Sequence, residues 1–400
     1  MQVKNFSRVL TVLAMAVTTL VACGGGGDVV PLPLLTLDGK QPLVVAHRGA
    51  SGYIPEQTLE AYIRAIDLGA DAIEPDIIST KDGVLIARHD PELSISTNVA
   101  SLPIYANRKR TTTVDGEAQT GWFANDFTLA EIKTLGGIST DAERPQQFNG
   151  LYKVVTLQEI IDLAKARSVN GRVVAVYPET KNPSYHKSIG LPLEDKLIAI
   201  INAAGWNSKD APIFVQSFEP GSLKEMRSKG LKTKLIQLID ADDVDLATGK
   251  LTFAAPYDRP YDWFLSGDKR LFSDMVTPAG LADIKTYADG IGPWKPYIIS
   301  VKGQLDAAGK VRDINGDGKV NYADASSLPP TTLIADAHKA GLLVHAYTFR
   351  NESRRIPADF KNNPKEEYKA YLRLGIDGLF SDFADTAIQA RSEYLKELGR

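Results

Sequence analysis

The sequence has little cysteine and histidine, and it lacks the motifs of several common protein classes. A single cysteine among 400 residues excludes a disulfide framework, and no Cys/His spacing typical of a zinc site occurs. Neither a glycine-rich phosphate loop nor a polybasic run is present. The net charge of −3 argues against a nucleic-acid-binding protein, because such proteins usually present a basic face. No coiled-coil or other association signature indicates a protein partner.

Long apolar runs are also scarce, and the longest lies near the N-terminus. It reads VLTVLAMAVTTLVA, which is short for a membrane span but typical of a signal peptide. The run ends in LVAC followed by GGGG, which resembles a bacterial lipoprotein box. That resemblance implies that residues 1–22 are removed, that lipid is attached to Cys23, and that residues 23–40 form a flexible tether. Gly24 then favours a periplasmic protein anchored in the outer membrane; the alternative is a secreted protein with a chance cysteine.

The rest of the chain alternates between apolar strand patterns and amphipathic helix patterns. Hydrophobic residues make up 44% of the sequence, which is enough for a substantial core. Strands are predicted at residues 43–47, 70–78, 172–178, 212–218, 232–239, 288–292, 342–349 and 376–382. Helical patterns stand between consecutive strands. Eight such alternations favour an α/β fold, a (β/α)₈ TIM barrel over residues 41–400, rather than an open doubly wound sheet.

Polar side chains concentrate at the ends of three early apolar runs. PLVVAH ends at His47 with Arg48 after it, and LIARHD carries His89. Alternation in ADAIEPDII directs Glu74 and Asp76 to the same side. Two imidazoles, a guanidinium and two carboxylates are the groups needed to cut a phosphate ester with a divalent cation. A lone histidine at a strand end is more often structural, but two that bracket a carboxylate pair favour catalysis.

The strand pattern RVVAVYPETK adds two further candidates. Glu179 and Lys181 are two residues apart, so they face the same mouth of the predicted barrel. Glu179 offers a third oxygen ligand for a hard cation, and Lys181 offers a point charge for a phosphate.

These segments resemble the glycerophosphodiester phosphodiesterase family. The resemblance lies in HRGASGYIPEQT, the Glu74 and Asp76 pair, HDPEL, VYPETK, QSF, HAYTFR and DGLFSDFAD, and it covers nearly the whole mature chain. It implies a TIM barrel with a small insertion after the second strand, and metal-dependent hydrolysis of glycerophosphodiesters to an alcohol and sn-glycerol 3-phosphate. The sequence departs slightly from the family at Tyr177 and Pro178, where a branched apolar residue and an acid are common.

The resemblance also implies a role for each candidate residue. It implies that His47 and His89 are the acid and base. It also implies that Glu74, Asp76 and Glu179 bind the metal and that Arg48 and Lys181 bind the phosphate. Calcium is the expected ion, with magnesium as the alternative. From their positions at predicted strand ends, we also expect Gln216 to bind a glycerol hydroxyl and Phe218 and Tyr347 to pack against the alcohol.

Two segments interrupt the alternation of strands and helices. Residues 94–150 are polar and without a strong period, and we interpret them as the insertion that caps the mouth and selects the alcohol. Residues 313–324, DINGDGKVNYAD, match a calcium loop, although the last position is Asp rather than the Glu of an EF-hand. The alternative for that loop is a solvated turn. Its predicted ligand positions are Asp313, Asn315, Asp317, Lys319, Asn321 and Asp324.

Three histidines receive other interpretations. His186 follows a predicted strand and is expected at the surface or the substrate rim, whereas His338 and His345 are expected to be structural. Two other functions remain open: a phospholipase of the C or D type on the same barrel, and a surface protein that binds a partner without catalysis. The polar character of residues 94–150 argues against the first, and the complete set of catalytic residue types argues against the second.

Overall fold

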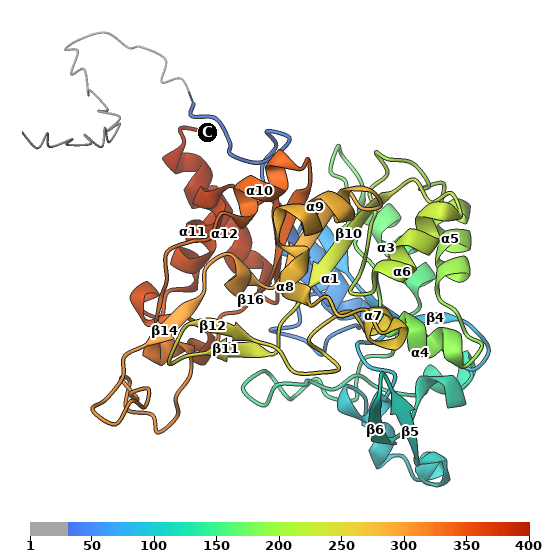
Figure 1. Ribbon diagram of the computed structural model, residues 1–400. Coiled ribbons are helices and arrows are strands. Elements are labelled where there is room, and N and C mark those ends of the chain that lie inside the picture. The colour runs from blue at the N-terminus through green and yellow to red at the C-terminus, as the bar shows by residue number, and fades with distance from the viewer. Residues whose placement is uncertain (1–30) are drawn as a thin grey trace, which may run out of the picture.

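The computed structural model describes residues 31–400, with a central sheet among surrounding helices (Figure 1). The strand pairings close this sheet into a ring of eight parallel positions, two of which hold two short strands each. In ring order they are β1 (Leu43–His47), β2 with β3 (Ala72–Glu74, Asp76–Ser79), β7 with β8 (Ala175–Val176, Glu179–Thr180), β9 (Phe214–Ser217), β10 (Lys234–Ile239), β13 (Gly290–Pro293), β16 (Leu343–Phe349) and β17 (Gly378–Ser381). Each neighbouring pair is parallel, and β17 pairs with β1. The predicted TIM barrel is therefore confirmed.

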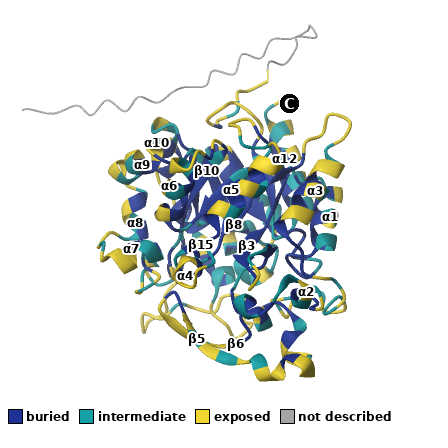
Figure 2. Cartoon of the chain, turned by 90° about the vertical axis from the view of Figure 1, so that its right-hand side faces the viewer, coloured by how far each residue is buried: buried dark blue, intermediate teal, exposed yellow. Residues whose placement is uncertain are grey.

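Helices surround the ring and cover the buried strands (Figure 2). They are α1 (Leu59–Asp67), α3 (Leu157–Arg167), α5 (Glu194–Ala203), α6 (Pro220–Ser228), α9 (Pro278–Lys285), α10 (Leu333–Lys339), α11 (Pro364–Leu374) and α12 (Ala384–Glu397). Local sequence explains where α3 begins: the Thr156 hydroxyl accepts from the Glu159 N–H, and the Glu159 carboxylate accepts from the Thr156 N–H. Ile160 and Ile161 of this helix pack into the main core.

Two prolines interrupt neighbouring barrel strands at the same level. Ile73 pairs with Val176 and Asp76 pairs with Glu179, so the constant register sets Pro75 opposite Pro178. Because proline has no N–H to donate, each strand is broken there into two short pieces. The acidic residues next to these breaks lie on adjacent strands at one height in the barrel.

The third early apolar run, LIARHD, forms β4 (Leu85–Ala87), which is not a barrel strand. It pairs antiparallel with β3, Ile77 with Ala87, so this run returns along β3 instead of joining the parallel ring. The tight turn at residues 80–83 reverses the chain, with Gly83 at a φ of 81°. The return strand brings the Arg88 N–H to 3.0 Å from the Asp76 carbonyl, and His89 follows directly.

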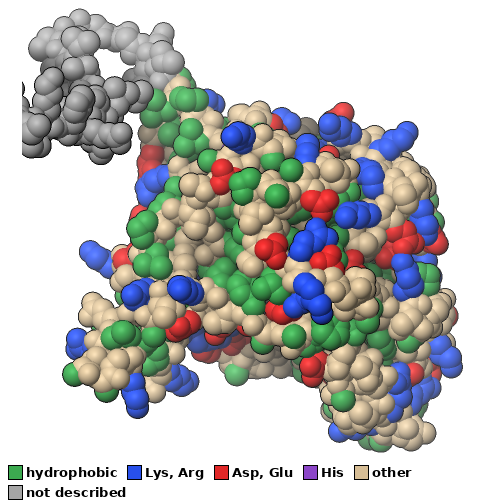
Figure 3. Space-filling view, in the orientation of Figure 1, with side chains coloured by type: hydrophobic (Ala, Val, Ile, Leu, Met, Phe, Trp, Pro, Cys, Tyr) green, Lys and Arg blue, Asp and Glu red, His purple; other side chains and the backbone are tan. Residues whose placement is uncertain are grey.

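The segments outside the barrel pattern gather at one end, opposite the C-terminus (Figure 1). They include the hairpins β5–β6 (Arg110–Val114, Glu117–Gly121), β11–β12 (Asp243–Asp245, Lys250–Thr252) and β14–β15 (Val301–Gly303, Ala325–Ser327). Short helices accompany them: α2 (Leu129–Ile132), α4 (Pro183–Ser188), α7 (Tyr261–Ser266) and α8 (Phe272–Met275). Figure 3 shows acidic and basic side chains interspersed over this view of the surface.

The segment 94–150 has a small apolar core of its own, although its sequence shows no strong period. Tyr105, Trp122, Phe127 and Leu135 are buried there together with residues of the β3–β4 hairpin. This core is separate from the main one, so the insertion packs as a distinct layer over the hairpin.

The predictions for the signal peptide and Cys23 lie outside the described residues, as do residues 23–30 of the predicted tether. Among residues 31–400, no helix combines the length and apolarity that crossing a bilayer requires.

Candidate active site

A cavity of about 870 Å³ opens at the end of the barrel where the outer segments gather. Most of the residues that the sequence singled out line it: His47, Arg48, Glu74, His89, Glu179, Lys181, Gln216, Phe218 and Tyr347. These side chains come from the ends of β1, β2, β8, β9 and β16 and from the segment after β4. The mouth of a parallel barrel is where catalytic groups on TIM barrels are found.

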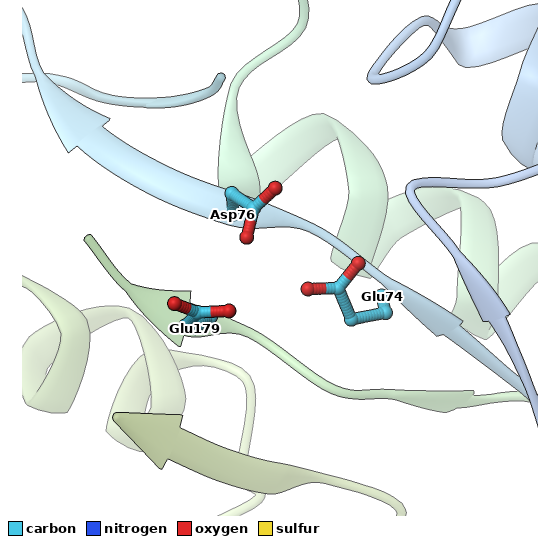
Figure 4. A group of neighbouring side chains, drawn as sticks. All are labelled: Glu74, Asp76 and Glu179. Atoms are coloured by element: carbon cyan, nitrogen blue, oxygen red, sulfur yellow. The ribbon is translucent and has the colours of Figure 1, made fainter. Parts of the chain in front are cut away.

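Glu74, Asp76 and Glu179 form one acidic group (Figure 4), of which Glu74 and Glu179 line the cavity and Asp76 does not. Each offers a carboxylate oxygen within 4.8 Å of the others, and all three residues are buried. Among the described residues, this is the one group of His, Cys, Asp and Glu side chains close enough to share a metal ion. The register of β3 and β8, in which Asp76 pairs with Glu179, brings the two strands' carboxylates together.

The donor set fits a hard divalent cation. All three donors are carboxylates, which Ca²⁺ and Mg²⁺ prefer over softer metals. Asp76 Oδ1 is buried and accepts no hydrogen bond from the described residues, so it has a lone pair available for an ion. Burial and the neighbouring Asp76 and Glu179 charges raise the pKa of Glu74 well above its usual range. A cation between the carboxylates would relieve that repulsion.

Two basic side chains already offset part of the negative charge. Arg48 Nε lies 3.1 Å from Asp76 Oδ2, and Lys181 Nζ lies 2.7 Å from Glu179 Oε1. Although burial acts to raise it, Arg48 and Lys181 hold the pKa of Asp76 well below normal. Burial raises the pKa of Glu179 to about 8 despite the opposing charge of Lys181. The group therefore mixes one firmly ionised carboxylate with two that hold protons more readily.

The backbone beside Arg48 adopts an unusual conformation that serves the acidic group. Arg48 has a φ of 58° and Gln57 a φ of 61°, in the left-handed region that few residues other than glycine occupy. The Arg48 N–H thereby donates to Glu74 Oε2 at 2.8 Å, and Gln57 Nε2 donates to Asp76 Oδ2 at 2.6 Å. Sequence reasoning missed Gln57, although it lies within HRGASGYIPEQT, the segment that carried the resemblance.

His47 and His89 each have a carboxylate beside Nδ1. His47 Nδ1 lies 2.6 Å from Asp382 Oδ1, and His89 Nδ1 lies 3.1 Å from Asp90 Oδ2. A carboxylate at Nδ1 favours the tautomer that leaves Nε2 free to exchange protons. Burial, followed by the charge of Arg48, lowers the pKa of His47, and Asp382 acts against that shift.

Sequence reasoning missed the role of Asp382. It stands directly after strand β17, and His47 is the last residue of β1, so neighbouring strands end in the two partners. The DGLFSDFAD segment was noticed only as part of the resemblance, and a carboxylate directly after a barrel strand was the available signal.

The other predicted contact residues lie along the wall. Gln216 Nε2 donates to Glu74 Oε1 at 3.2 Å, which places this side chain behind the acidic group. The Phe218 ring lies 5.4 Å from Lys181 Nζ and 6.1 Å from the Tyr347 ring. Tyr347 donates its hydroxyl to the Ile239 carbonyl at 3.0 Å, so its ring is held at the wall.

One of the remaining histidines is not where the sequence placed it. His186 was expected at the surface or the rim, but it lies fully buried in α4, and burial lowers its pKa to about 3. His345 is buried, as expected, and its Nδ1 lies 2.7 Å from the Tyr177 hydroxyl. His338 Nε2 lies 2.8 Å from Asp377 Oδ2, a structural contact outside the cavity lining.

The loop at 313–324 is closed by its own side chains. Asp313 accepts from the N–H groups of Gly316 and Gly318 at 2.7 and 2.9 Å. Asp324 is fully buried and accepts from the N–H of Ile314 at 2.7 Å and of Asn321 at 3.0 Å. Asn315 and Asp317 accept from the N–H two residues on, whereas Lys319 donates only its backbone N–H, to Asp317. Calcium binding by this loop stays a prediction.

The family model for the "Glycerophosphoryl diester phosphodiesterase family" matches residues 47–386. The chain belongs to this family. It is 37% identical to glycerophosphodiester phosphodiesterase GDPD6 of Arabidopsis thaliana over 360 residues, which cover 87% of the chain and 85% of that relative. It is 27% identical to the glycerophosphodiester phosphodiesterase of Haemophilus influenzae, covering 87% of the chain and 89% of that relative. The predicted family and enzyme class are confirmed.

Solved structures of family members share the fold. A glycerophosphoryl diester phosphodiesterase structure from Silicibacter pomeroyi matches with a TM-score of 0.57 at 19% identity, covering 90% of this chain and 98% of that one. An Oleispira antarctica phosphodiesterase in complex with the product sn-glycerol-3-phosphate matches with a TM-score of 0.51 at 17% identity, covering 89% and 99%.

Proposed function

We propose that this enzyme hydrolyses glycerophosphodiesters to an alcohol and sn-glycerol 3-phosphate, with a divalent cation, first of all Ca²⁺, held by Glu74, Asp76 and Glu179. The observation that carries the proposal is the grouping of these three carboxylates in the cavity region that His47 and His89 also line. The Oleispira relative was solved with sn-glycerol-3-phosphate, which supports a substrate of this size and charge.

The residues of the cavity contribute in two ways, by stabilising charge and by transferring protons. A bound cation would act as a Lewis acid toward a phosphate oxygen. Arg48 and Lys181 offset the charge that builds on the phosphate in the transition state. One histidine takes a proton from the nucleophile while the other gives a proton to the leaving alcohol. The nucleophile is a water molecule or the substrate's own glycerol 2-hydroxyl. In the second case the alcohol leaves, a cyclic phosphate forms, and water then opens it to sn-glycerol 3-phosphate.

Hydrolysis of glycerophosphocholine by the purified chain without residues 1–23 tests the proposal. After chelation we expect no release of glycerol 3-phosphate, and restored Ca²⁺ or Mg²⁺ should return it. His47→Ala and His89→Ala should each lower kcat at least about 100-fold, as loss of general acid or base catalysis does. Turnover that survives chelation, or near-normal turnover by either variant, would contradict the proposal.

A lipid phosphodiesterase is the second candidate, and one observation favours it. Ile95 and Ile104, both in the insertion, are 49% and 77% exposed. Exposed apolar side chains near a mouth are what an enzyme needs to enter a bilayer. Intact phosphatidylcholine vesicles assayed beside glycerophosphocholine separate the candidates, because cleavage of the intact lipid would establish the second.

For the cellular location we propose a periplasmic lipoprotein anchored in the outer membrane through Cys23, on the strength of LVAC and of Gly24 after it. Mass spectrometry of the full chain expressed in a two-membraned bacterium tests it. Diacylation at Cys23, lost in Cys23→Ser, is the expected result, and an unmodified free protein would contradict it.

A further inference from the structure

Asp382, the partner of His47, has a second oxygen that faces the insertion. Its Oδ2 accepts from Arg144 Nη2 at 2.5 Å and lies 2.9 Å from Arg350 Nε. The carboxylate is buried, and the charges of Arg350, His47 and Arg144 outweigh burial and hold the pKa of Asp382 well below its usual range. Asp382 is thus an ionised group with one oxygen on the imidazole and the other on two guanidiniums.

Arg144 belongs to the insertion, in a stretch without regular secondary structure. Its side chain is buried and makes four contacts with the barrel. Besides Asp382, its Nε donates to Glu352 Oε1 at 2.8 Å and its Nη1 donates to the Ser51 carbonyl at 3.3 Å. The guanidinium carbon also lies 5.7 Å from the centre of the Phe383 ring. A planar fork of donors suits this arrangement, and the single ammonium of lysine does not.

The neighbouring contacts show that the insertion is fastened here by other means too. Arg354 of the barrel lies 2.7 Å from Glu143 Oε1 and also 2.5 Å from Asp141 Oδ2. Those ion pairs are partly exposed to solvent. Arg144 instead pairs with a buried carboxylate, at the desolvation cost that buried charges carry.

We propose that Arg144 is a positioning residue through which the insertion holds the imidazole of His47 in its orientation. By holding Asp382 Oδ2, Arg144 fixes the carboxylate plane, so that Oδ1 keeps His47 Nδ1 protonated and Nε2 available to the substrate. The insertion is then part of the catalytic apparatus as well as a cap over it. The inference rests on the proposed role of His47 in proton transfer.

The test compares Arg144→Ala with Glu143→Ala, which removes the neighbouring ion pair and leaves Asp382 untouched. We expect Arg144→Ala to lower kcat by roughly 10- to 100-fold with KM within about threefold, as misplacement of a catalytic group does. Glu143→Ala should keep both constants within about threefold. Added ethylguanidinium should restore part of the kcat of Arg144→Ala and leave the control unchanged.

A second readout follows the imidazole directly. The chain has five histidines, so ¹⁵N spectra of labelled protein are tractable, and the resonance missing from His47→Ala assigns His47. Wild type should show His47 protonated at Nδ1, and Arg144→Ala should show a mixture of tautomers. If Arg144→Ala does not fold, Arg144→Lys replaces it; it keeps the charge but cannot hold Asp382 and Glu352 together, and kcat should fall about tenfold.

The same variants distinguish a failure of the proposed function from a failure of the inference about Arg144. In the His47→Ala background, Arg144→Ala should cause no further loss, because both act through one imidazole. An active His47→Ala would overturn the proposed function and the inference with it. An inactive His47→Ala beside an Arg144→Ala with normal kcat and an unchanged tautomer would overturn the inference alone. Equal losses in Arg144→Ala and Glu143→Ala would also overturn it.

Discussion

Lys181 contacts two of the three central carboxylates at once. Its Nζ lies 2.7 Å from Glu179 Oε1 and 3.9 Å from Asp76 Oδ1. Burial acts to lower the pKa of Lys181, but the two carboxylates raise it above its usual value, so the side chain stays charged. One ammonium therefore offsets charge on two members of the acidic group, and under the proposed function it would also meet the phosphate.

Lys181→Met should lower kcat/KM by about 100-fold, because a charge that stabilises the transition state is lost. The three carboxylates would also repel one another more strongly, so Ca²⁺ should raise the thermal unfolding midpoint more in this variant than in wild type. Lys187→Met, at an exposed position paired with Glu225, is the matched control. A Lys181→Met enzyme with normal kcat/KM would contradict this role.

Glu179→Gln should weaken metal binding more than it weakens the fold. The charge on one of three ligands is lost, so the Ca²⁺ concentration for half-maximal activity should rise at least about tenfold, and excess Ca²⁺ should recover part of the rate. Titration of chelated enzyme measures this concentration. Asp243→Asn, another cavity carboxylate outside the acidic group, should leave it unchanged. An unaltered titration curve for Glu179→Gln would remove Glu179 from the ligand set.

His345 should make the fold sensitive to mild acid. Burial lowers its pKa to about 4, whereas an unfolded histidine titrates near 6.5. Between these values the unfolded state binds the extra proton, so stability is complete above pH 6.5 and falls as the pH drops toward 4, by about 1.4 kcal/mol per unit at most. Urea unfolding at pH 7 and pH 5 measures the loss. His345→Gln should lose roughly 2 kcal/mol less than wild type over this range, and an equal loss would exclude His345 as the source.

The 313–324 loop offers a separate metal test. If it binds calcium, Ca²⁺ should raise the unfolding midpoint of Glu179→Gln, where binding at the acidic group is weakened, and Asp317→Ala in that background should abolish the rise. Differential scanning calorimetry after chelation gives the comparison. Equal midpoints with and without Ca²⁺ would mean that the hydrogen bonds accepted by Asp313 and Asp324 close the loop unaided.

Much of the fold and most of the acidic group could be predicted because they depend on local patterns. The strands follow apolar runs. Asp76 and Glu179 each stand directly after a break in their strand, and the register pairs these two positions. The antiparallel direction of β4 could not be predicted, since the same apolar run fits either direction. Burial of His186 depends on how α4 packs, which its polar sequence NPSYHKS does not reveal.

How the charged partners of the site pair with one another was beyond the reach of sequence reasoning. Asp382 is 335 residues from His47, and Arg144 is 238 residues from Asp382. Which buried guanidinium meets which carboxylate is decided by the packing of loops from different barrel strands, and residue spacing carries no trace of it. The sequence therefore indicated the groups that act on the substrate more readily than those that orient them.

The separate core of the insertion has a consequence for the design of new substrate preferences. Because Tyr105, Trp122 and Phe127 pack against Ile78 and Ile86 of the β3–β4 hairpin and not into the main core, an exchange of residues 94–150 between relatives would have to preserve that hairpin surface. Such a transplant would still need a guanidinium at the position of Arg144. A chimera without that guanidinium would still fold with the acidic group intact, but the imidazole of its His47 would no longer be held in one orientation.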